Sequence, residues 1–249
     1  MTTPSDASNT DVPVPSWIKN TNAHGSRLYA ILASTNDAAG LKAYYALDGK
    51  NTPQGLYAGT PYARWYPVMP MLVELSPYSS FLTWVNDNAT PAWGWLARSP
   101  MPKSVIAKHL AGLTQVMMPS GQTVFFRYWD GRFFSLHIKY LGDKWRTVLP
   151  AFSDYWVDGQ VFTCSTEYDT EIPTSPWWHV PQALLDKMAS NNPTPQINNL
   201  MQKLRENYPL IYSQWAEPVL RQRLRTLLTP ERRLKPNLLQ RIITELEKG

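Results

Sequence analysis

The sequence predicts an α+β fold with two lobes, a mixed α/β N-terminal lobe with a small sheet and an all-helical C-terminal lobe. Between Arg27 and about residue 165, strand-like runs of β-branched and aromatic residues alternate with runs of helical spacing. After Pro181 only the helical spacing continues. The 249 residues are 43% hydrophobic, enough to bury the core of one large domain or two small ones.

These patterns divide the chain into four segments. Residues 1–25 are rich in Ser, Thr, Asn, Asp and Pro, and we expect a disordered or loosely attached tail there. The α/β lobe is expected over residues 26–165, a connection over 166–180 and the helical lobe over 181–249. Acidic, aromatic and proline residues are mixed over 153–180, a composition that predicts a long irregular segment.

The elements of each lobe follow from local patterns. In the first lobe we expect strands over 27–33, 68–75, 113–118 and 123–129, and helices over 78–88, 104–112 and 132–141. The last two strands form a hairpin, because Pro119, Ser120 and Gly121 supply a turn between them. In the second lobe, helices are expected near residues 195–208 and 217–228, and over a stripe made by Leu238, Leu239, Ile242, Ile243 and Leu246.

A group of charged residues directly follows the second hairpin strand. Arg127 and Asp130 end its apolar run, and Arg132 opens the next helix. Gly131 allows a sharp exit, through a backbone angle that other residues resist. Because an unpaired buried charge is costly, Arg127 and Asp130 must find partners. Two interpretations remain open: a structural salt bridge that fixes this corner, or an arginine fork offered to a partner's carboxylate or carbonyl.

Basic residues concentrate at the C-terminal end of the chain. Residues 200–249 hold ten Lys and Arg against five Glu, so this segment carries the whole formal charge of +5. Its densest cluster comprises Arg221, Arg223, Arg225, Arg232 and Arg233. Such a cluster can attract an anionic partner or bind phosphates, or it can be a solvated helix face paired with local glutamates.

Composition bears on the compartment. Cys164 is the only cysteine, so no intrachain disulfide can form and a reducing compartment is expected. The sequence shows neither a basic start followed by an apolar run nor an apolar stretch of membrane-spanning length, so we expect a cytoplasmic protein without membrane contact.

The chain is rich in aromatic residues, and most of them should lie in the core. Some should face a partner, and the candidates are Trp65, Trp84, Trp93, Trp95, Trp129, Trp145, Trp156, Trp177 and Trp178.

The sequence carries none of the common catalytic motifs. It has no nucleophile elbow, phosphate-binding loop, His-Glu-x-x-His pair or dinucleotide fingerprint. The four histidines lie far apart, so we expect no metal and no cofactor. Cys164 and His179 are the types of a nucleophile and a base, but the apolar-polar alternation around Cys164 is typical of a strand core. The absence of such motifs does not by itself exclude an enzyme, but nothing in the sequence favours one, and we expect no enzymatic activity.

The segment from Pro119 to Phe134 resembles the signature of a family of bacterial adaptor chaperones. The shared pattern is a Gly-containing turn and a hydrophobic strand that ends in Arg, two aromatic residues, Asp, any residue and Arg. Weaker matches follow the family's order at residues 27–34, 56–60, 70–75, 93–96 and 104–116, so the resemblance spans about residues 26–150. The family usually has Pro where this chain has Gly131, a difference expected to loosen the corner.

Members of this family are encoded beside toxic effectors of type VI secretion systems and load them onto the VgrG spike. The resemblance therefore implies an adaptor that works by protein–protein binding, with a cognate secreted toxin and VgrG as its partners. Alternatives are a nucleic-acid-binding module that uses the basic C-terminal helices, or a hydrolase with an unrecognised site. The adaptor interpretation excludes nucleic acid as a partner, and its predicted partner-binding residues are Arg127, Tyr128, Trp129, Asp130, Arg132, Arg221 and Arg225.

Overall fold

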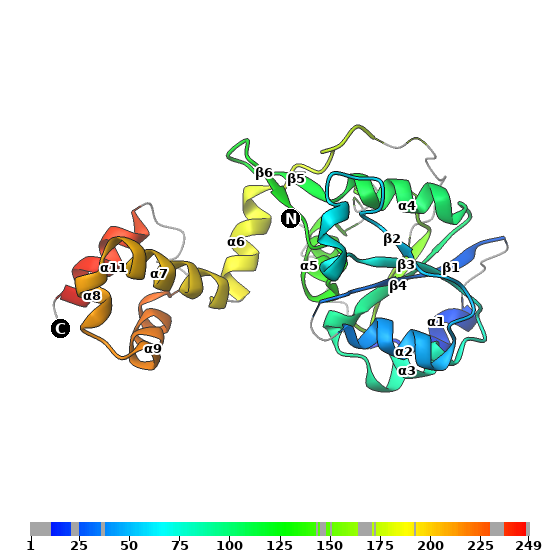
Figure 1. The fold of residues 1–249 in the computed structure, drawn as a ribbon, viewed down its shortest axis with the longest axis horizontal. Helices are drawn as coiled ribbons and strands as arrows, with labels where there is room; N and C mark the ends of the chain where they lie inside the picture. The colour runs from blue at the N-terminus through cyan, green and yellow to red at the C-terminus, as the bar shows by residue number, and fades with distance from the viewer. Residues whose placement is uncertain are drawn as a thin grey trace, which may run out of the picture. The chain divides into compact units, whose positions relative to one another are not determined.

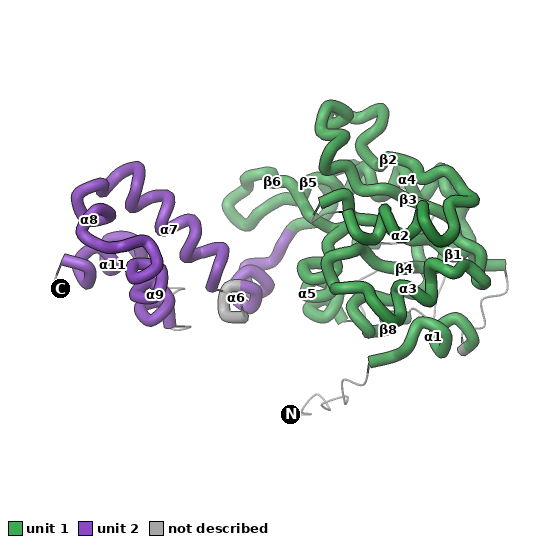
Figure 2. The backbone as a smooth tube through the Cα atoms, turned by 60° about the horizontal axis from the view of Figure 1, so that its bottom comes forward, with its two compact units in different colours: residues 1–179 green, residues 180–249 purple. Residues whose placement is uncertain are grey.

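The computed structural model describes residues 11–20, 25–35, 38–142, 144, 148–149, 151–163, 171, 173–191, 193–229 and 237–247. The chain forms two compact units, residues 1–179 (unit 1) and residues 180–249 (unit 2), coloured separately in Figure 2. Unit 1 holds both sheets, and the described elements of unit 2 are all helices. The predicted α+β fold class is confirmed.

The main sheet of unit 1 has six strands in the order β2-β3-β1-β4-β7-β8, and all neighbours are antiparallel. The strands are β1 (Arg27–Leu32), β2 (Gln54–Gly55), β3 (Met71–Leu75), β4 (Gly94–Ser99), β7 (Asp154–Val157) and β8 (Gln160–Thr163). β1 lies between β3 and β4. Its sequence RLYAIL suits this place, since every residue after the arginine is apolar and buried.

Helices cover both faces of this sheet (Figure 1). On one face, α1 (Val14–Asn20), α2 (Ala39–Leu47) and α3 (Ser80–Asn88) share a core with alternate residues of β1, namely Leu28, Ala30 and Leu32. Figure 1 shows α4 (Lys103–Gly112) on the other side. On that face the Phe134 ring of α5 (Gly131–Leu141) stacks on Trp95 of β4, with centroids 4.6 Å apart.

The predicted hairpin is confirmed. β5 (Gln115–Met117) pairs with β6 (Thr123–Phe125), and they form a separate two-stranded sheet. The end of unit 1 lies beside β5, because the amide of Met117 donates to the carbonyl of Trp178 at 2.9 Å and Met117 forms a parallel bridge with His179. Two short 3₁₀ helices, η2 (Ala63–Val68) and η3 (Pro91–Trp93), complete the described elements of unit 1.

The structure corrects the predicted tail over residues 1–25, because residues 14–20 form α1. Val14 and Trp17 are 0% and 2% exposed in the core of unit 1. The indole Nε1 of Trp17 donates to Oδ1 of Asp154 at 2.7 Å, and Nη2 of Arg98 donates to the carbonyl of Trp17 at 3.0 Å. So short a helix draws its stability from tertiary contacts, which composition alone does not reveal. Residues 1–10 and 21–24 lie outside the described residues.

The strands β7 and β8 replace part of the irregular segment predicted over residues 153–180. They form a hairpin whose two turn residues, Asp158 and Gly159, have left-handed φ values of 52° and 74°. β7 joins the sheet by pairing with β4, where the buried Tyr155 lies opposite Ala97. Cys164, which the sequence analysis placed in a strand core, lies outside the described residues.

Unit 2 contains α6 (Gln182–Asn191), α7 (Thr194–Asn207), α8 (Pro209–Ser213), α9 (Glu217–Leu227) and α11 (Leu238–Glu247). Its helices have a core of their own, made of Ile197, Leu200, Met201, Leu204, Ile211, Leu220, Leu224, Leu228, Ile242, Ile243 and Leu246. The apolar spacing that predicted three of these helices therefore marks their buried faces.

Candidate functional site

The charged corner predicted after the hairpin is built around Asp130. This residue is the N-cap of α5, and its Oδ1 accepts a hydrogen bond from the amide of Arg132 at 3.2 Å. Aspartate is among the preferred N-cap residues because its carboxylate satisfies an amide that the helix leaves free. The sequence therefore sets the start of α5 and the position of the Asp130 carboxylate together.

Two arginines neutralise this carboxylate, which is 0% exposed. Arg127 donates from Nη2 to Oδ2 at 3.0 Å. Arg132 grips both oxygens, from Nε to Oδ1 at 2.9 Å and from Nη2 to Oδ2 at 2.7 Å, and these hydrogen bonds raise the pKa of its guanidinium. A bidentate arginine is a strong and geometrically specific partner for a carboxylate. The corner thus contains the structural salt bridge that was one of the two interpretations of the sequence, with Asp130 as its buried centre.

The two arginines also face outward. The side chains of Arg127 and Arg132 are 44% and 50% exposed, and both guanidinium groups lie over the ring of Phe133, at 5.1 and 5.9 Å. Held by Asp130 and by Phe133, the two forks have few conformations left to lose when a second ligand binds. The two interpretations of the corner are therefore compatible. The arginines form a structural salt bridge with Asp130, and they remain exposed enough to bind a group of a partner.

Gly131 fits the corner for a different reason from the one predicted. Its φ is not among the positive values in the described chain. Instead, a Cβ atom at this position would lie 2.5 Å from the carbonyl oxygen of Pro91 and 3.0 Å from that of Gly94. Glycine therefore lets the first turn of α5 approach the backbone of η3 and β4, and the corner is closely packed where a loosened one was expected.

Tyr128 and Trp129 were predicted to face a partner, and the structure buries both, at 0% and 2% exposure. Trp95 fixes the backbone between Tyr128 and Trp129, since its Nε1 donates to the carbonyl of Tyr128 at 2.8 Å. The Trp129 ring packs edge-on against Tyr57 and Phe125. Both side chains therefore belong to the core of unit 1, in place of the partner-facing role given to them.

A series of aromatic contacts connects this core to the surface. Tyr57 packs against Tyr62 and Phe125, and Phe125 packs against Trp65 with centroids 5.1 Å apart. Every residue of η2 is exposed, with Trp65 at 39% and Tyr66 at 75%. We call the surface formed by Tyr62, Trp65, Tyr66 and Phe125 the aromatic platform. Of the tryptophans proposed to face a partner, Trp65 is exposed, and Trp145 lies outside the described residues.

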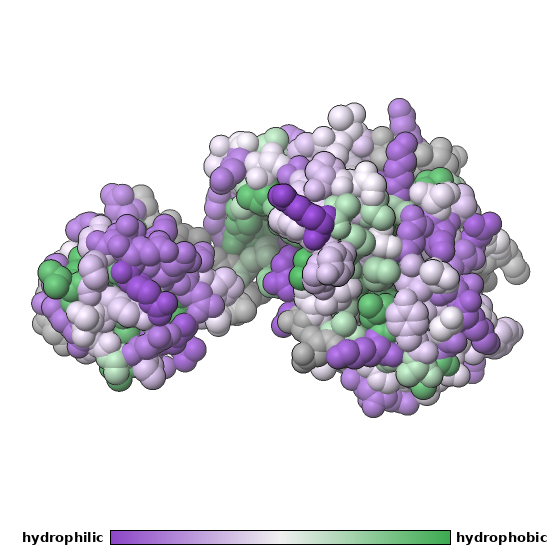
Figure 3. Space-filling view, in the orientation of Figure 1, coloured by the Kyte–Doolittle hydropathy of each residue, from purple (hydrophilic) through white to green (hydrophobic). Residues whose placement is uncertain are grey.

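Arg221 and Arg225, the other predicted site residues, belong to α9 in unit 2. Arg221 is tied to Glu217, from Nε at 3.1 Å and Nη2 at 3.0 Å, and to Asn198 at 2.7 Å. Arg225 donates to Gln222 at 3.1 Å. The face of unit 2 in Figure 3 is mostly hydrophilic. These contacts match the interpretation of a solvated helix face paired with local glutamates, while Arg232 and Arg233 lie outside the described residues.

In the described part of the chain, no three His, Cys, Asp or Glu side chains gather as metal ligands would. No described helix has the length and apolar character needed to cross a membrane. The pairing of Cys164 with His179 that the sequence analysis considered cannot be followed, since Cys164 lies outside the described residues.

Comparison with known proteins gives one match. No curated protein and no solved structure matches the chain. Residues 28–147, which run from β1 past the charged corner and α5, match the domain of unknown function DUF4123, a family generally linked to effector adaptors of type VI secretion systems.

Proposed function

We propose that this chain is an adaptor chaperone that binds a toxic effector of a type VI secretion system and loads it onto the VgrG spike. It acts by protein–protein binding, without catalysis and without nucleic acid. The observation that carries the proposal is the match of residues 28–147 to a family linked to such adaptors. The charged corner that the sequence shares with these adaptors lies within the matched segment.

Two surfaces of unit 1 support this function. The guanidinium groups of Arg127 and Arg132 are held in place yet about half exposed, as suits recognition of carboxylates or carbonyls. The aromatic platform offers apolar area next to polar tips, and aromatic residues and arginine are enriched at the centres of protein interfaces. Arginine forks and exposed rings thus supply both orientation and buried area for a protein partner.

Co-purification tests the proposal. The tagged chain is expressed with its genomic neighbours and captured at moderate salt, and bound proteins are identified by mass spectrometry. We expect a toxin and VgrG, with yields lowered about tenfold or more by Arg127→Gln or Arg132→Gln, a typical cost for an interface hot spot. Each variant leaves the other arginine on Asp130, so the fold should survive. Lys42→Gln and Lys108→Gln, at exposed positions, are the charge-matched controls.

The aromatic platform is tested with a variant inside it and a control variant outside it. Tyr66→Ser should lower capture, whereas Tyr78→Ser, at a tyrosine that is 95% exposed outside the platform, should leave it unchanged. Unfolding midpoints of all variants are compared with that of the unmodified chain. Capture of nucleic acid in place of proteins, or full capture by both arginine variants, would contradict the proposed function.

A further inference from the structure

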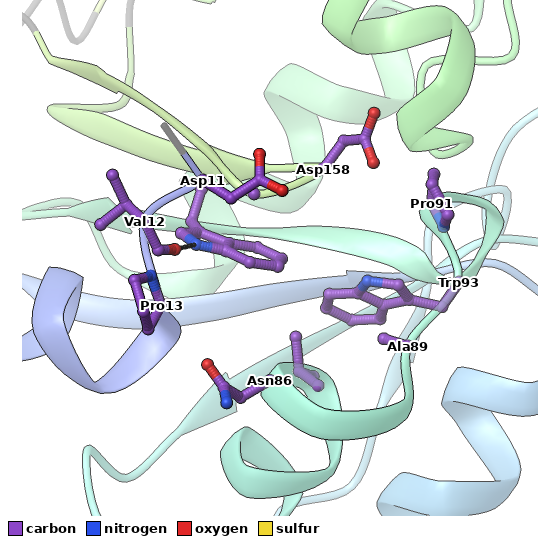
Figure 4. Close-up of a pocket in the computed structure, with 11 residues that line it drawn as sticks. Asp11, Val12, Pro13, Asn86, Ala89, Pro91, Trp93 and Asp158 are labelled. Atoms are coloured by element: carbon purple, nitrogen blue, oxygen red, sulfur yellow. Dashed lines mark hydrogen bonds between the residues drawn. The ribbon is translucent and has the colours of Figure 1, made fainter. Parts of the chain in front are cut away.

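A cavity of about 340 Å³ lies in unit 1, and neither arginine of the charged corner is among its lining residues. Its lining comes from the segment before α1, the end of α3, η3 and the β7–β8 turn, and Figure 4 shows its side chains. Trp93 and Trp156, 4% and 7% exposed, contribute indole rings. Asp11 and Asp158 contribute carboxylates, and Figure 4 shows them on the same side of the cavity, across from Asn86 and Ala89.

The chain holds these groups together with defined contacts. The amide of Val12 donates to the carbonyl of Gly159 at 2.7 Å, and Nε1 of Trp156 donates to the carbonyl of Val12 at 2.7 Å. Asp11 is thereby fixed beside the β7–β8 turn. Its Oδ1 lies so close that a Cβ atom on Gly159 would be 2.8 Å from it. The position of Asp11 thus follows from contacts that link the start of the described chain to β7 and β8.

The cavity has the chemistry of a cation site. No Lys, Arg or His is among its lining residues. Within the described part of the chain, neither Asp11 nor Asp158 has an ion-pair partner. Two carboxylates that line the same cavity repel each other, and a cation in that cavity would relieve the repulsion. Indole rings add to this preference, because tryptophan is the best aromatic partner for a cation.

We propose that this cavity receives an arginine side chain of a partner protein. A guanidinium is more weakly hydrated than an ammonium, it stacks on aromatic rings, and its five donors can serve two carboxylates at once. Arginine is also a frequent anchor residue at protein interfaces. The choice of a protein as the source of the cation rests on the proposed adaptor function, whereas the cation preference rests on the cavity alone.

The first test uses the purified full chain and Nα-acetyl-L-arginine amide as the probe. The indole N–H resonances of Trp93 and Trp156, identified with Trp→Phe variants, should shift saturably, with a dissociation constant on the order of 1 mM, as for a weak single-residue ligand. The double variant Asp11→Asn/Asp158→Asn should weaken binding about tenfold, the equivalent of two modest ion pairs. Asparagine also tolerates the left-handed φ of residue 158, so the turn is kept.

The control variant removes two negative charges elsewhere. Asp186→Asn/Glu206→Gln changes a partly exposed and an exposed residue of unit 2, and this variant should bind the probe as the unmodified chain does. Absence of shifts at Trp93 and Trp156, or equal binding by the Asp11/Asp158 variant, would overturn the cation site. Tighter binding of choline than of the arginine probe would overturn a protein side chain as its natural ligand.

The second test separates this site from the adaptor function. Co-purification with the Asp11/Asp158 variant should lose at least one partner that the unmodified chain captures. Unchanged capture would overturn the partner arginine, whatever the probe shows. A third outcome is that the probe binds but the unmodified chain captures neither an effector nor VgrG. The adaptor function would then be wrong, and so would the assignment of the cation to a partner protein. The cation site itself would remain supported.

Discussion

Asp130 is the residue on which the charged corner depends. It is fully buried, it caps α5, and it binds two arginines that are about half exposed. Its charge is tolerated inside the unit because its oxygens are all satisfied, and its removal would leave the arginines without their anchor. Asp130 is thus a structural residue that positions two candidate partner-binding residues.

We predict that Asp130→Ala lowers the unfolding free energy of unit 1 by about 1–3 kcal/mol, because it removes the N-cap of α5 and the hydrogen bonds to two arginines that are themselves about half exposed. Asp130→Asn should cost less, because asparagine is an equally good N-cap and keeps the hydrogen bond to the amide of Arg132. Urea denaturation measures both. A loss below about 1 kcal/mol for the alanine variant would mean that the corner does not depend on this carboxylate.

His109 makes the stability of unit 1 depend on pH. It is 1% exposed in α4, and burial lowers the pKa of its imidazole from 6.5 to about 4, partly opposed by a hydrogen bond to the backbone of Val148. Between these pH values the unfolded chain binds a proton that the folded chain does not. The unfolding free energy therefore falls as the pH drops from 6.5 to 4, by up to about 3 kcal/mol.

Urea denaturation at pH 7.5 and pH 4.5 checks this expectation against His109→Asn, which keeps a donor but cannot titrate. The variant should lose less stability than the unmodified chain over this range. Burial also lowers the pKa of His137, which acts in the same direction and is common to both proteins. Equal losses in the two proteins would show that His109 does not titrate as its burial implies.

At the scale of elements, α1 is attached to two strands of the main sheet, β4 and β7, through Trp17. Trp17 donates to Asp154 on β7, and Arg98 on β4 lies with its guanidinium 4.5 Å from the centroid of the Trp17 ring. Burial raises the pKa of Asp154 and lowers that of Arg98, so the pair is held at a cost in desolvation. The indole of Trp17 compensates part of this cost with a hydrogen bond and a ring face.

We predict that Trp17→Phe lowers the unfolding free energy of unit 1 by about 1–3 kcal/mol, because a smaller aromatic ring remains but the donor to a buried carboxylate is lost. Lys19→Gln, at an exposed position of the same helix, should change it by less than about 0.5 kcal/mol. Thermal denaturation of the two variants distinguishes them. If the Trp17→Phe and Lys19→Gln variants were equally stable, the hydrogen bond of the Trp17 indole would not be what attaches α1 to the sheet.

Elements with local signals were predictable within a few residues. The β5–β6 hairpin, α3, α4 and α5 each carry turn residues or helical spacing in their own sequence. β4 was missed because its sequence GWLARS contains an arginine, and Arg98 is buried only because Asp154, far along the chain, lies beside it. The β7–β8 hairpin did have a usable signal, the Asp158–Gly159 pair between the segments Tyr155–Val157 and Val161–Phe162.

The candidate site also contains features that local sequence can predict and features that depend on tertiary contacts. The ion pairs of Asp130 join residues within one short segment, so a structural salt bridge there could be named from the sequence as one of two open interpretations. The burial of Tyr128 and Trp129 depends on contacts with Trp95 and Tyr57 from other parts of the chain. The exposure of Tyr66 and the cavity beside Asp11 likewise depend on tertiary contacts, which spacing along one chain does not encode.

At the scale of the whole molecule, two units have two separate cores. The core of unit 2 consists of residues from Ile197 to Leu246, and the residues of the α1–α3 core of unit 1 lie between Val14 and Trp156. Since each unit buries its own apolar surface, each can unfold as its own cooperative transition.

This arrangement makes a calorimetric prediction. Leu224→Ala, at a position that is 0% exposed in unit 2, should destabilise that unit by about 2–5 kcal/mol and lower only one of two thermal transitions. Leu110→Ala, equally buried in α4 of unit 1, is the reciprocal control and should lower only the other transition. Differential scanning calorimetry of the full chain resolves the two. If both substitutions instead shift a single common transition by similar amounts, the units unfold together, and a free energy assigned to either one alone would have to be reassigned to the whole chain.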